Sequence, residues 1–494
     1  MFQTDGISDR DSIPRASTSS EISHVQDGKK IHANSMPAPT ATINWIEHET
    51  GANHATESQR LDDVIRVSDE QVIDARNFDW ILEASSTNSK RSYSLAEIED
   101  LALQNNAALG VALANIDKSS ALRYQVGLRP NPTLGYSGQQ MFDRGTDQHG
   151  IFVEQEFVRG NKLELNRRVL VFTQQAQTAE HEAQCYRVLT DVRIRFFQAI
   201  AAQKQLAAAE AFAEVAQQGV ELAEERQRAQ EGTLIETLQA KTLSSEVNLD
   251  VERARLTYLG AWRELAALIG LSDLEPHELL GDFQDDPGLP NWDEAFNEIT
   301  AKSPELAAAN ALVCEKQALL HRQQVQAIPN FTTQLGAGYD RGTDHGMLNL
   351  QIGAPLTIYN QNRGNINAAQ ADYSRAVLEV ERIQQSIRAR LARVAQEYET
   401  AVATIKRYST EIIPQTAESL SLAEKAYRAG ELDFLDVLII RRTYYTALNR
   451  VIDAKADLAQ ASARLEGLLL EGGLNSPADY TDRDEIRRNT FEGQ

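Results

Sequence analysis

Two very long runs of heptad-spaced residues constrain the fold of this 494-residue chain more than any other feature. The spacing alternates steps of three and four, which keeps one stripe of a helix against a partner along a left-handed supercoil. In the second half the stripe is Ile366, Ala369, Tyr373, Ala376, Val380, Ile383 and Ile387, then, after an extra step of four, Leu391, Val394, Tyr398, Ala401, Ile405, Tyr408 and Ile412. In the first half it is Leu165, Val169, Phe172, Ala176, Ala179, Ala183 and Tyr186. At 1.5 Å per residue, a run of about 65 residues predicts a helix on the order of 100 Å long.

The two runs belong to a tandem duplication with a period of about 200 residues. Each half has the same order of segments: a short helix, a hairpin, a very long helix, a turn and a second long helix. The halves are predicted at 91–271, with its hairpin at 131–158, and at 291–471, with its hairpin at 330–357. A linker at 272–290 joins them, and a tail at 472–494 follows.

Composition excludes several classes of protein. The formal net charge of −22 would repel a nucleic acid, so no nucleic-acid partner is expected. Cys185 and Cys314 have no neighbours at metal-ligand spacing, which predicts neither a disulfide framework nor a zinc site. No catalytic constellation and no cofactor motif stands out, so the chain is not expected to be an enzyme.

The N-terminal segment 1–90 is rich in Ser, Asp, Thr and Asn and is predicted to be a disordered extension. It lacks a basic stretch followed by an apolar one, so no signal peptide is evident in it.

Strict alternation of apolar and polar residues marks both hairpins. In the second, Leu348, Leu350 and Ile352 alternate with Met347, Asn349 and Gln351; in the first, Ile151, Val153 and Phe157 alternate with Glu154 and Glu156. This is the pattern of a membrane β-strand with an apolar face toward lipid and a polar face toward a lumen. Four strands cannot close a barrel, and open edges are not tolerated in lipid. The pattern therefore predicts a homo-oligomer with a shared barrel, in which Glu154 and Glu156 face the lumen.

With these features, the chain resembles the TolC-like outer-membrane efflux family over roughly residues 94–471. The resemblance lies in "SLAEIEDLALQNNAAL", "LRPNPTLGYS", "APLTIYNQNRGNINAAQA" and "AYRAGELDFLDVL". The form "PLTIYNQNRG" is similar to the heavy-metal branch of that family.

The resemblance implies a mixed α+β membrane protein. Three copies would form a homotrimer, with two hairpins from each closing a twelve-stranded barrel in the outer membrane, in contact with lipid. Long helices would continue it as a tunnel through the periplasm, with 272–290 and the C-terminal tail packed around its waist. A periplasmic adaptor protein and an inner-membrane pump would be the partners. The channel itself would conduct substrates passively, heavy-metal cations or drugs, without catalysis.

The far turns of the long helices carry clustered carboxylates, which threefold symmetry would turn into rings able to select cations. These are Glu231, Glu236, Glu431, Asp433 and Asp436. Gly232 and Gly430 suit a left-handed backbone at the turns. The simpler interpretation is a solvated, charged helix turn.

Four residues beyond the second turn are candidates for ties that close the duct: Arg441, Arg442, Tyr444 and Tyr445. The same tips are the expected adaptor contact. Ordinary packing on a helix surface is the alternative.

The octets "FDRGTDQHG" and "YDRGTDHG" stand between the strands of each hairpin. We expect Gly145, Gly150, Gly342 and Gly346 to make the bends. Asp147 with His149, and Asp344 with His345, leave a metal site open as a lesser alternative, since each loop offers two ligands only.

The heptads alone favour an alternative function: a soluble coiled-coil scaffold, or a periplasmic adaptor without a pore. Such a protein has no use for four strands with a lipid-compatible face.

Overall fold

The computed structural model describes residues 92–141, 145–230, 232–283, 288–429 and 431–481. All of them belong to one of the two units into which the chain divides, Ile73–Gln494. The predicted extension 1–90 and two predicted tip residues, Glu231 and Gly430, lie outside the described residues.

The elements follow the duplicated order expected from the sequence. The first repeat contains α2 (Leu95–Asn105), α3 (Ala107–Gln125), β2 (Thr133–Gln139), β3 (Gln148–Phe157), α4 (Lys162–Arg228) and α5 (Leu234–Ile269). The second contains α6 (Trp292–Lys302), α7 (Pro304–Val325), β5 (Phe331–Asp340), β6 (His345–Gly353), α8 (Arg363–Arg407), the π-helical turn η1 (Tyr408–Ile412), α9 (Ile413–Arg428) and α10 (Phe434–Glu466). Two short strands, β1 (Tyr93–Ser94) and β4 (Leu279–Leu280), pair in parallel.

Polar caps divide the first helical segment of each repeat in two. Asn106 ends α2 and caps α3, with its side chain accepting a hydrogen bond from the Ala108 amide. Ser303 plays the same part between α6 and α7, where Pro304 occupies the first turn and its missing N–H costs nothing. Each repeat therefore begins with a helix pair instead of the single short helix that the sequence predicts.

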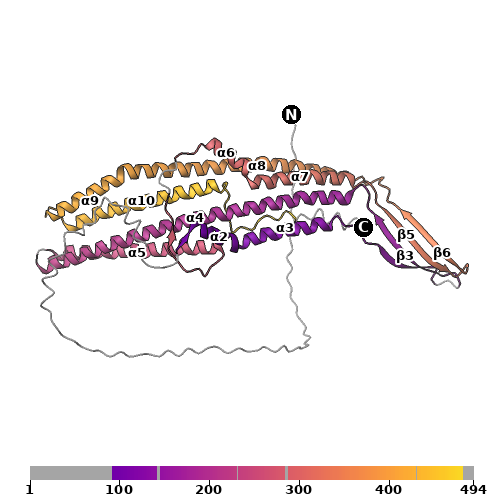
Figure 1. Ribbon diagram of the computed structural model, residues 1–494, viewed down its shortest axis with the longest axis horizontal. Helices are drawn as coiled ribbons and strands as arrows, with labels where there is room; N and C mark the ends of the chain where they lie inside the picture. Colours follow the sequence, from indigo (N-terminus) through magenta and orange to yellow (C-terminus); the bar gives the residue numbers. More distant parts are fainter. Residues whose placement is uncertain (1–91, 142–144, 231, 284–287, 430, 482–494) are drawn as a thin grey trace, which may run out of the picture. The chain divides into compact units, whose positions relative to one another are not determined.

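Helix α4 is the central element of the helical region. It packs against α3 and α7 near the sheet and against α5 and α10 toward the helix tips (Figure 1). Because neighbours surround it, buried residues occur around most of its circumference, and they include polar ones such as Gln177 and Gln184. Of the predicted stripe, Leu165, Val169, Ala176 and Ala183 are buried, whereas Phe172, Ala179 and Tyr186 are partly buried. The stripe is only part of what α4 buries.

Helix α8 has fewer neighbours and shows the predicted stripe clearly. It packs mainly on α7 and α10. Its buried residues are all predicted stripe residues: Ala369, Ile383, Ile387, Leu391, Val394, Tyr398, Ala401 and Ile405. The heptad prediction is confirmed along this helix, and its other side is exposed.

Beyond Ile412, where the predicted stripe ends, the buried residues no longer follow its spacing. Tyr408 and Ile412 are only partly buried, and the next buried residues are Leu420 and Ala423. A stripe continued in steps of three and four would reach 419 and 422 instead. The cause is η1, where the Ile413 amide bonds to the Tyr408 carbonyl and one extra residue is fitted into the turn. Pro414 follows, and since it has no N–H it cannot complete a regular α-helical ladder there.

The four longer strands form one antiparallel sheet in the order β2-β3-β5-β6. The two hairpins are thus joined to each other through β3 and β5, which pair from Gln148 with Asp340 to Phe157 with Phe331. Figure 1 shows this sheet at the opposite end of α4 from the helix tips.

None of the helices within the described ranges is long and apolar enough to span a membrane.

The segment between the repeats and the C-terminal tail both pack on the helices. Phe283 and Leu279 join a core with Phe196 and Ile200 of α4. In the tail, the Gly472 and Gly473 amides both donate to Asp191 of α4, at 3.1 and 2.7 Å. Lys118 of α3 forms an ion pair with Asp479 at 2.5 Å. Residues 482–494 lie outside the described part of the chain.

Candidate functional site

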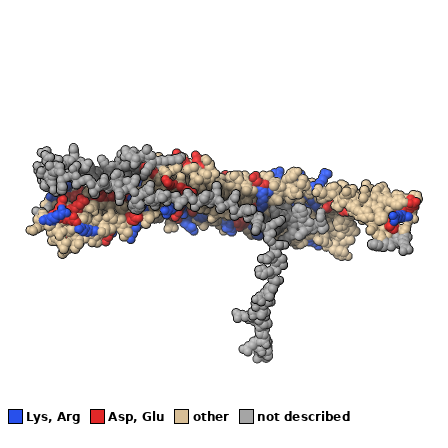
Figure 2. All heavy atoms as spheres, turned by 90° about the horizontal axis from the view of Figure 1, so that it is seen from below, with Lys and Arg blue, Asp and Glu red and all other residues tan. Residues whose placement is uncertain are grey.

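One face of the four-stranded sheet is apolar and exposed. Strand pairing aligns its residues in rows across all four strands, one of which is Leu134, Val153, Leu335 and Leu350, and the next Tyr136, Ile151, Ala337 and Leu348. The large apolar side chains of these rows are exposed to solvent in the single chain. Figure 2 shows few charged side chains over the sheet, whereas they gather at the turns that join its strands. An exposed apolar surface of this extent marks a contact with a membrane or with another protein.

The opposite face of the sheet is polar. Glu154 lies in a row with Thr133, Gln334 and Gln351, and Glu156 lies beside Thr332. Glu156 accepts a hydrogen bond of 2.7 Å from the Asn330 side chain. The alternation read from the sequence therefore matches the register of the sheet, with both glutamates on the face away from the apolar rows.

Phe152 interrupts this polar face and was missed in the sequence. Its ring covers Gly135 of the neighbouring strand, where a Cβ would come within 2.3 Å of the ring. A side chain at position 135 would have to displace this ring. The signal in the sequence was one bulky residue, Phe152, whose partners on the two neighbouring strands are both glycines, Gly135 and Gly336.

The outer strands of the sheet, β2 and β6, each pair with only one other strand among the described residues. Their free edges expose backbone donors and acceptors, which an apolar environment would leave unsatisfied. The sheet is therefore an incomplete unit.

The turns of the hairpins use fewer of the octet glycines than expected. Gly145 has φ +98° and Gly342 lies in the second turn, but Gly150 and Gly346 lie inside β3 and β6. Gly150 is needed for close approach, because a Cβ there would lie 2.9 Å from the Ala337 carbonyl oxygen. In the second turn the left-handed residue is Asp344, with φ 58°.

The acidic and histidine side chains of the octets have protein partners. Asp147 is within 3.2 Å of Arg341 and 3.7 Å of His149. Tyr339 donates to Asp344, and the His345 ring contacts the Thr343 carbonyl oxygen at 2.5 Å. Within the described ranges, no three His, Cys, Asp or Glu residues are grouped as a metal site would need.

At the tip turn between α4 and α5, the prediction of a left-handed backbone at Gly232 is wrong. The left-handed residue between α4 and α5 is Gln230, with φ 61°, and Gly232 does not have a positive φ. Gly232 is instead in a tight place, since a Cβ would lie 3.1 Å from the Arg226 Cβ and 3.3 Å from the Gln227 nitrogen. A side chain at position 232 would crowd the end of α4, so the position is restricted by space and not by its backbone angles.

The tip carboxylates differ in their surroundings. Glu236 closes a capping box with Thr233 at the start of α5, with 3.1 Å between its oxygen and the Thr233 hydroxyl. Asp433 caps α10 without a side-chain hydrogen bond to the helix, and Asp436 lies in the first turn. Glu431, Asp433 and Asp436 are exposed.

The two tip arginines join different elements. Arg441 of α10 pairs with Glu424 of α9, so it holds one helix pair together. Arg442 pairs with Glu246 of α5 at 3.1 Å, and that ion pair links the tip of the second repeat to the tip of the first.

The two tip tyrosines are half-buried. Tyr445 stacks on Phe212 of α4 with 5.2 Å between ring centroids, and Tyr444 packs beside the cluster of Leu420, Ala423 and Val437. Burial raises the pKa of both hydroxyls, so both are neutral at physiological pH.

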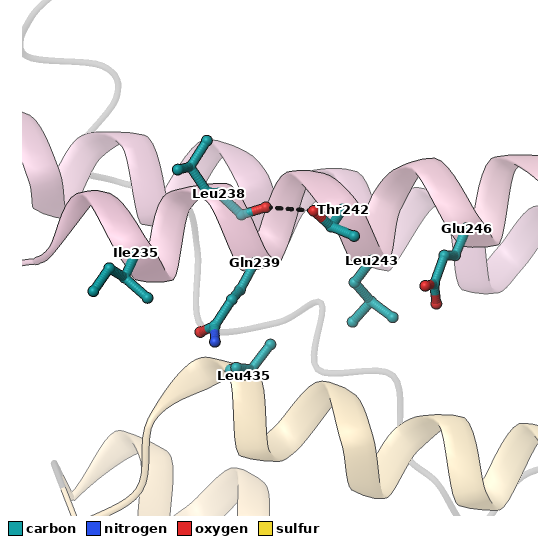
Figure 3. Close-up of a pocket in the computed structure, with 7 residues that line it drawn as sticks. All are labelled: Ile235, Leu238, Gln239, Thr242, Leu243, Glu246 and Leu435. Carbon is teal, nitrogen blue, oxygen red and sulfur yellow. Dashed lines mark hydrogen bonds between the residues drawn. The ribbon is translucent and has the colours of Figure 1, made fainter.

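A shallow apolar groove runs along α5 next to the start of α10. Figure 3 shows its lining residues, Ile235, Leu238, Gln239, Thr242, Leu243 and Glu246 of α5 and Leu435 of α10. Ile235 and Leu238 are exposed. The groove ends at Glu246, the partner of Arg442.

Residues 99–271 and 295–469 both match the family described as outer membrane efflux protein. The chain is 25% identical over 377 residues to the cobalt-zinc-cadmium resistance protein CzcC of Cupriavidus metallidurans, covering 75% of this chain and 88% of that protein. It is 24% identical to the pyoverdine export outer membrane protein OpmQ of Pseudomonas putida, covering 55% of this chain and 59% of that one.

Solved structures share the fold. A membrane protein from Pseudomonas aeruginosa matches with a TM-score of 0.65 and 18% identity, covering 76% of this chain and 92% of that one. CusC, described as forming a transmembrane channel, matches with a TM-score of 0.64 and 16% identity, covering 78% and 93%.

The chain belongs to the outer membrane efflux protein family. It is an outer-membrane efflux channel protein, built as a tandem repeat of long helices with two β-hairpins. The family and the fold class expected from the sequence are confirmed.

Proposed function

We propose that three copies of this chain form the outer-membrane duct of a tripartite efflux system and pass heavy-metal cations to the exterior. One observation carries the proposal most: an exposed apolar sheet face that extends over all four strands, opposite a polar face with Glu154 and Glu156. The apolar face fits lipid and the polar face fits a water-filled lumen.

The free edges of β2 and β6 support the oligomer. If β6 of one copy pairs with β2 of the next, the edges disappear once the ring closes. Three copies then give twelve strands, and the helices extend from the barrel into the periplasm. Each copy would contribute both of its repeats, 91–271 and 291–471.

The helix tips would receive the partners. The apolar groove on α5 suits a helix of a periplasmic adaptor, because Ile235 and Leu238 are exposed beside it. The adaptor would connect the duct to an inner-membrane pump. The exposed carboxylates Glu431, Asp433 and Asp436 would form acidic rings at the entrance.

The similarity to a cobalt-zinc-cadmium resistance protein supports heavy-metal cations as the substrate. The net charge of −22 favours cations as well, since an acidic duct raises their local concentration. A soluble scaffold or an adaptor without a pore would leave the apolar sheet face without a partner.

The proposal is tested with the full chain extracted in detergent and reconstituted in planar bilayers. We expect a particle with the mass of three copies and discrete cation-preferring conductance. Alanine at both Glu431 and Asp433 should lower the cation preference, whereas Ser476→Ala, in the tail, should not. A monomer that stays in solution without detergent would contradict the duct.

Substrate class is tested in cells that lack their own channel of this kind. Expression with a matching adaptor and pump should raise tolerance to cobalt, zinc or cadmium. Export of an organic chelator without any change in metal tolerance would contradict the metal assignment and leave the duct intact.

A further inference from the structure

Each repeat has two junctions between its strands and its helices, and they follow a common pattern. A strand-to-helix junction leads from β3 into α4 and from β6 into α8, each through an Asn in the left-handed conformation, Asn161 with φ 55° and Asn362 with φ 60°. The first helical residue is then basic, Lys162 or Arg363. A helix-to-strand junction leads from α3 into β2 and from α7 into β5, and it contains Pro130-Asn131 or Pro329-Asn330.

Within the chain, the junction between β3 and α4 contacts the junction between α7 and β5. Lys162 Nζ donates to the Ile328 carbonyl oxygen at 2.6 Å and to Asn330 Oδ1 at 2.9 Å. The Arg159 amide donates to the same Asn330 oxygen at 3.2 Å. This contact leaves Lys162 only 4% exposed. The strand-to-helix junction of the first repeat is thus locked onto the helix-to-strand junction of the second.

The remaining two junctions do not meet within the chain. Arg363 and Asn131 have the same positions in their junctions as Lys162 and Asn330, at the helix start and after the proline, and both are exposed. They flank β6 and β2, the two strands whose outer edges are open.

Exposed apolar side chains surround both of these junctions. Before Arg363, Leu356 is 81% exposed, Ile358 is 64% exposed and Tyr359 is 99% exposed. Before Asn131, Tyr124 and Leu128 are also exposed. Each junction therefore has an uncovered apolar surface next to a polar group that its duplicate uses for a hydrogen bond.

We infer that the occupant is a second copy of this chain: Arg363 of one copy bonds to Asn131 of the next, as Lys162 bonds to Asn330 within a copy. The inference rests on the proposed ring of copies and specifies its joint. Leu356, Ile358 and Tyr359 cover Tyr124 and Leu128 of that next copy. The guanidinium has several donors in a fixed plane, so it can reach the Asn131 oxygen and the preceding carbonyl together.

The two linkers differ in a way that fits this joint. Between β3 and α4 the linker is four residues, 158–161, whereas between β6 and α8 it is nine, 354–362. The longer linker holds the three exposed apolar residues. Inside a chain the joint is made once by folding, but between copies it must be held by burial of additional apolar surface.

Chemical cross-linking tests the joint. In a background with Cys185→Ala and Cys314→Ala, Asn131→Cys and Arg363→Cys are combined in the full chain. A short bifunctional maleimide should then give a covalent trimer on a denaturing gel. A flexible reagent is chosen because a disulfide demands a narrow geometry. Each single variant, and Asn131→Cys with Lys302→Cys on α6, should give no covalent trimer.

Mass measurement in detergent separates the possible outcomes. A particle of three copies without cross-linking at the 131–363 pair would overturn the joint and leave the proposed duct standing. Absence of any oligomer would overturn both. A Tyr359 that is labelled by a lipid-borne probe in the intact trimer would place the linker against the membrane and would also overturn the joint.

Charge reversal at these exposed residues gives a second measurement. Arg363→Glu should lower the temperature at which the trimer dissociates, and adding Asn131→Lys should restore most of the loss. Lys302→Glu is the matched control and should leave that temperature unchanged. Failure of Asn131→Lys to rescue would count against direct contact.

Discussion

At the scale of single residues, the two ion pairs at the helix tips have different roles. One stabilises a single helix pair, and the other connects the helix pairs of the two repeats. Arg441 with Glu424 lies within the α9–α10 pair, whereas Arg442 with Glu246 connects α10 to α5. The two arginines are adjacent in the sequence and were predicted to act together. Their separate roles depend on which side of α10 each occupies and on partners 17 and 196 residues away, which no local pattern reveals.

Loss of the Arg442–Glu246 pair is expected to loosen the tips. Both side chains are about half exposed, so their coupling is worth about 0.2–1 kcal/mol. Arg442→Ala removes one such pair from each copy, so it should raise the open fraction of single channels by about fivefold at most for each pair lost. Glu246→Ala should have a similar effect, and the double variant should add little to either.

Arg253→Ala, on α5 beside Asp250, is the matched control for the open fraction. Additive effects of Arg442→Ala and Glu246→Ala, or equal opening of the channel by the control, would disprove that this ion pair connects the two helix pairs.

At the scale of elements, the long helices were predictable and their irregularities were not. Heptad spacing identifies α8 because that helix buries a single stripe. It identifies α4 less well, since neighbours on several sides bury polar residues too. The η1 turn changes the phase of the stripe by one residue, and Pro414 was the one signal of it in the sequence.

A deletion distinguishes the η1 turn from ordinary helix. Removing Ser409 together with Pro414→Ala should convert η1 into regular α-helix while Leu420 and Ala423 still face Val437. Removing Thr400 in the same Pro414→Ala background should rotate everything after it by about 100° and expose those residues.

Urea unfolding of the two variants provides the measurement. We expect the Ser409 deletion to stay within about 1 kcal/mol of the Pro414→Ala parent and the Thr400 deletion to lose several kcal/mol, because buried apolar side chains would be turned out. Equal losses would show that η1 does not carry an inserted residue.

At the scale of the whole molecule, the exposed apolar face and the open edges of the sheet indicate assembly with other copies more clearly than any single site does. Alternation in the sequence was sufficient to predict the two faces, and the register agrees with it from Thr133 to Gly353. Which hairpins pair with each other was not predictable. Pairing of β3 with β5 depends on Gly150 and Gly338 approaching closely, and glycine content alone does not specify a partner.

The polar face should give the assembled pore its preference for cations. Gln at both Glu154 and Glu156 should lower the ratio of cation to anion permeability in low salt, as measured from reversal potentials. In about 1 M salt the difference should become small, because charges are screened within about 3 Å. Ser137→Ala, on the same face, is the control. A ratio that is unchanged at low salt would show that these carboxylates do not act on the permeating ions.

The two open edges of the sheet are different surfaces, so the proposed ring would be built from head-to-tail contacts. A copy with a damaged β6 edge can still attach to its neighbour through β2, yet nothing can follow it. In a cell that makes intact and damaged chains in equal amounts, roughly one ring in eight would consist of three intact copies. One impaired allele would therefore inactivate most of the assemblies, and the defect would behave as genetically dominant.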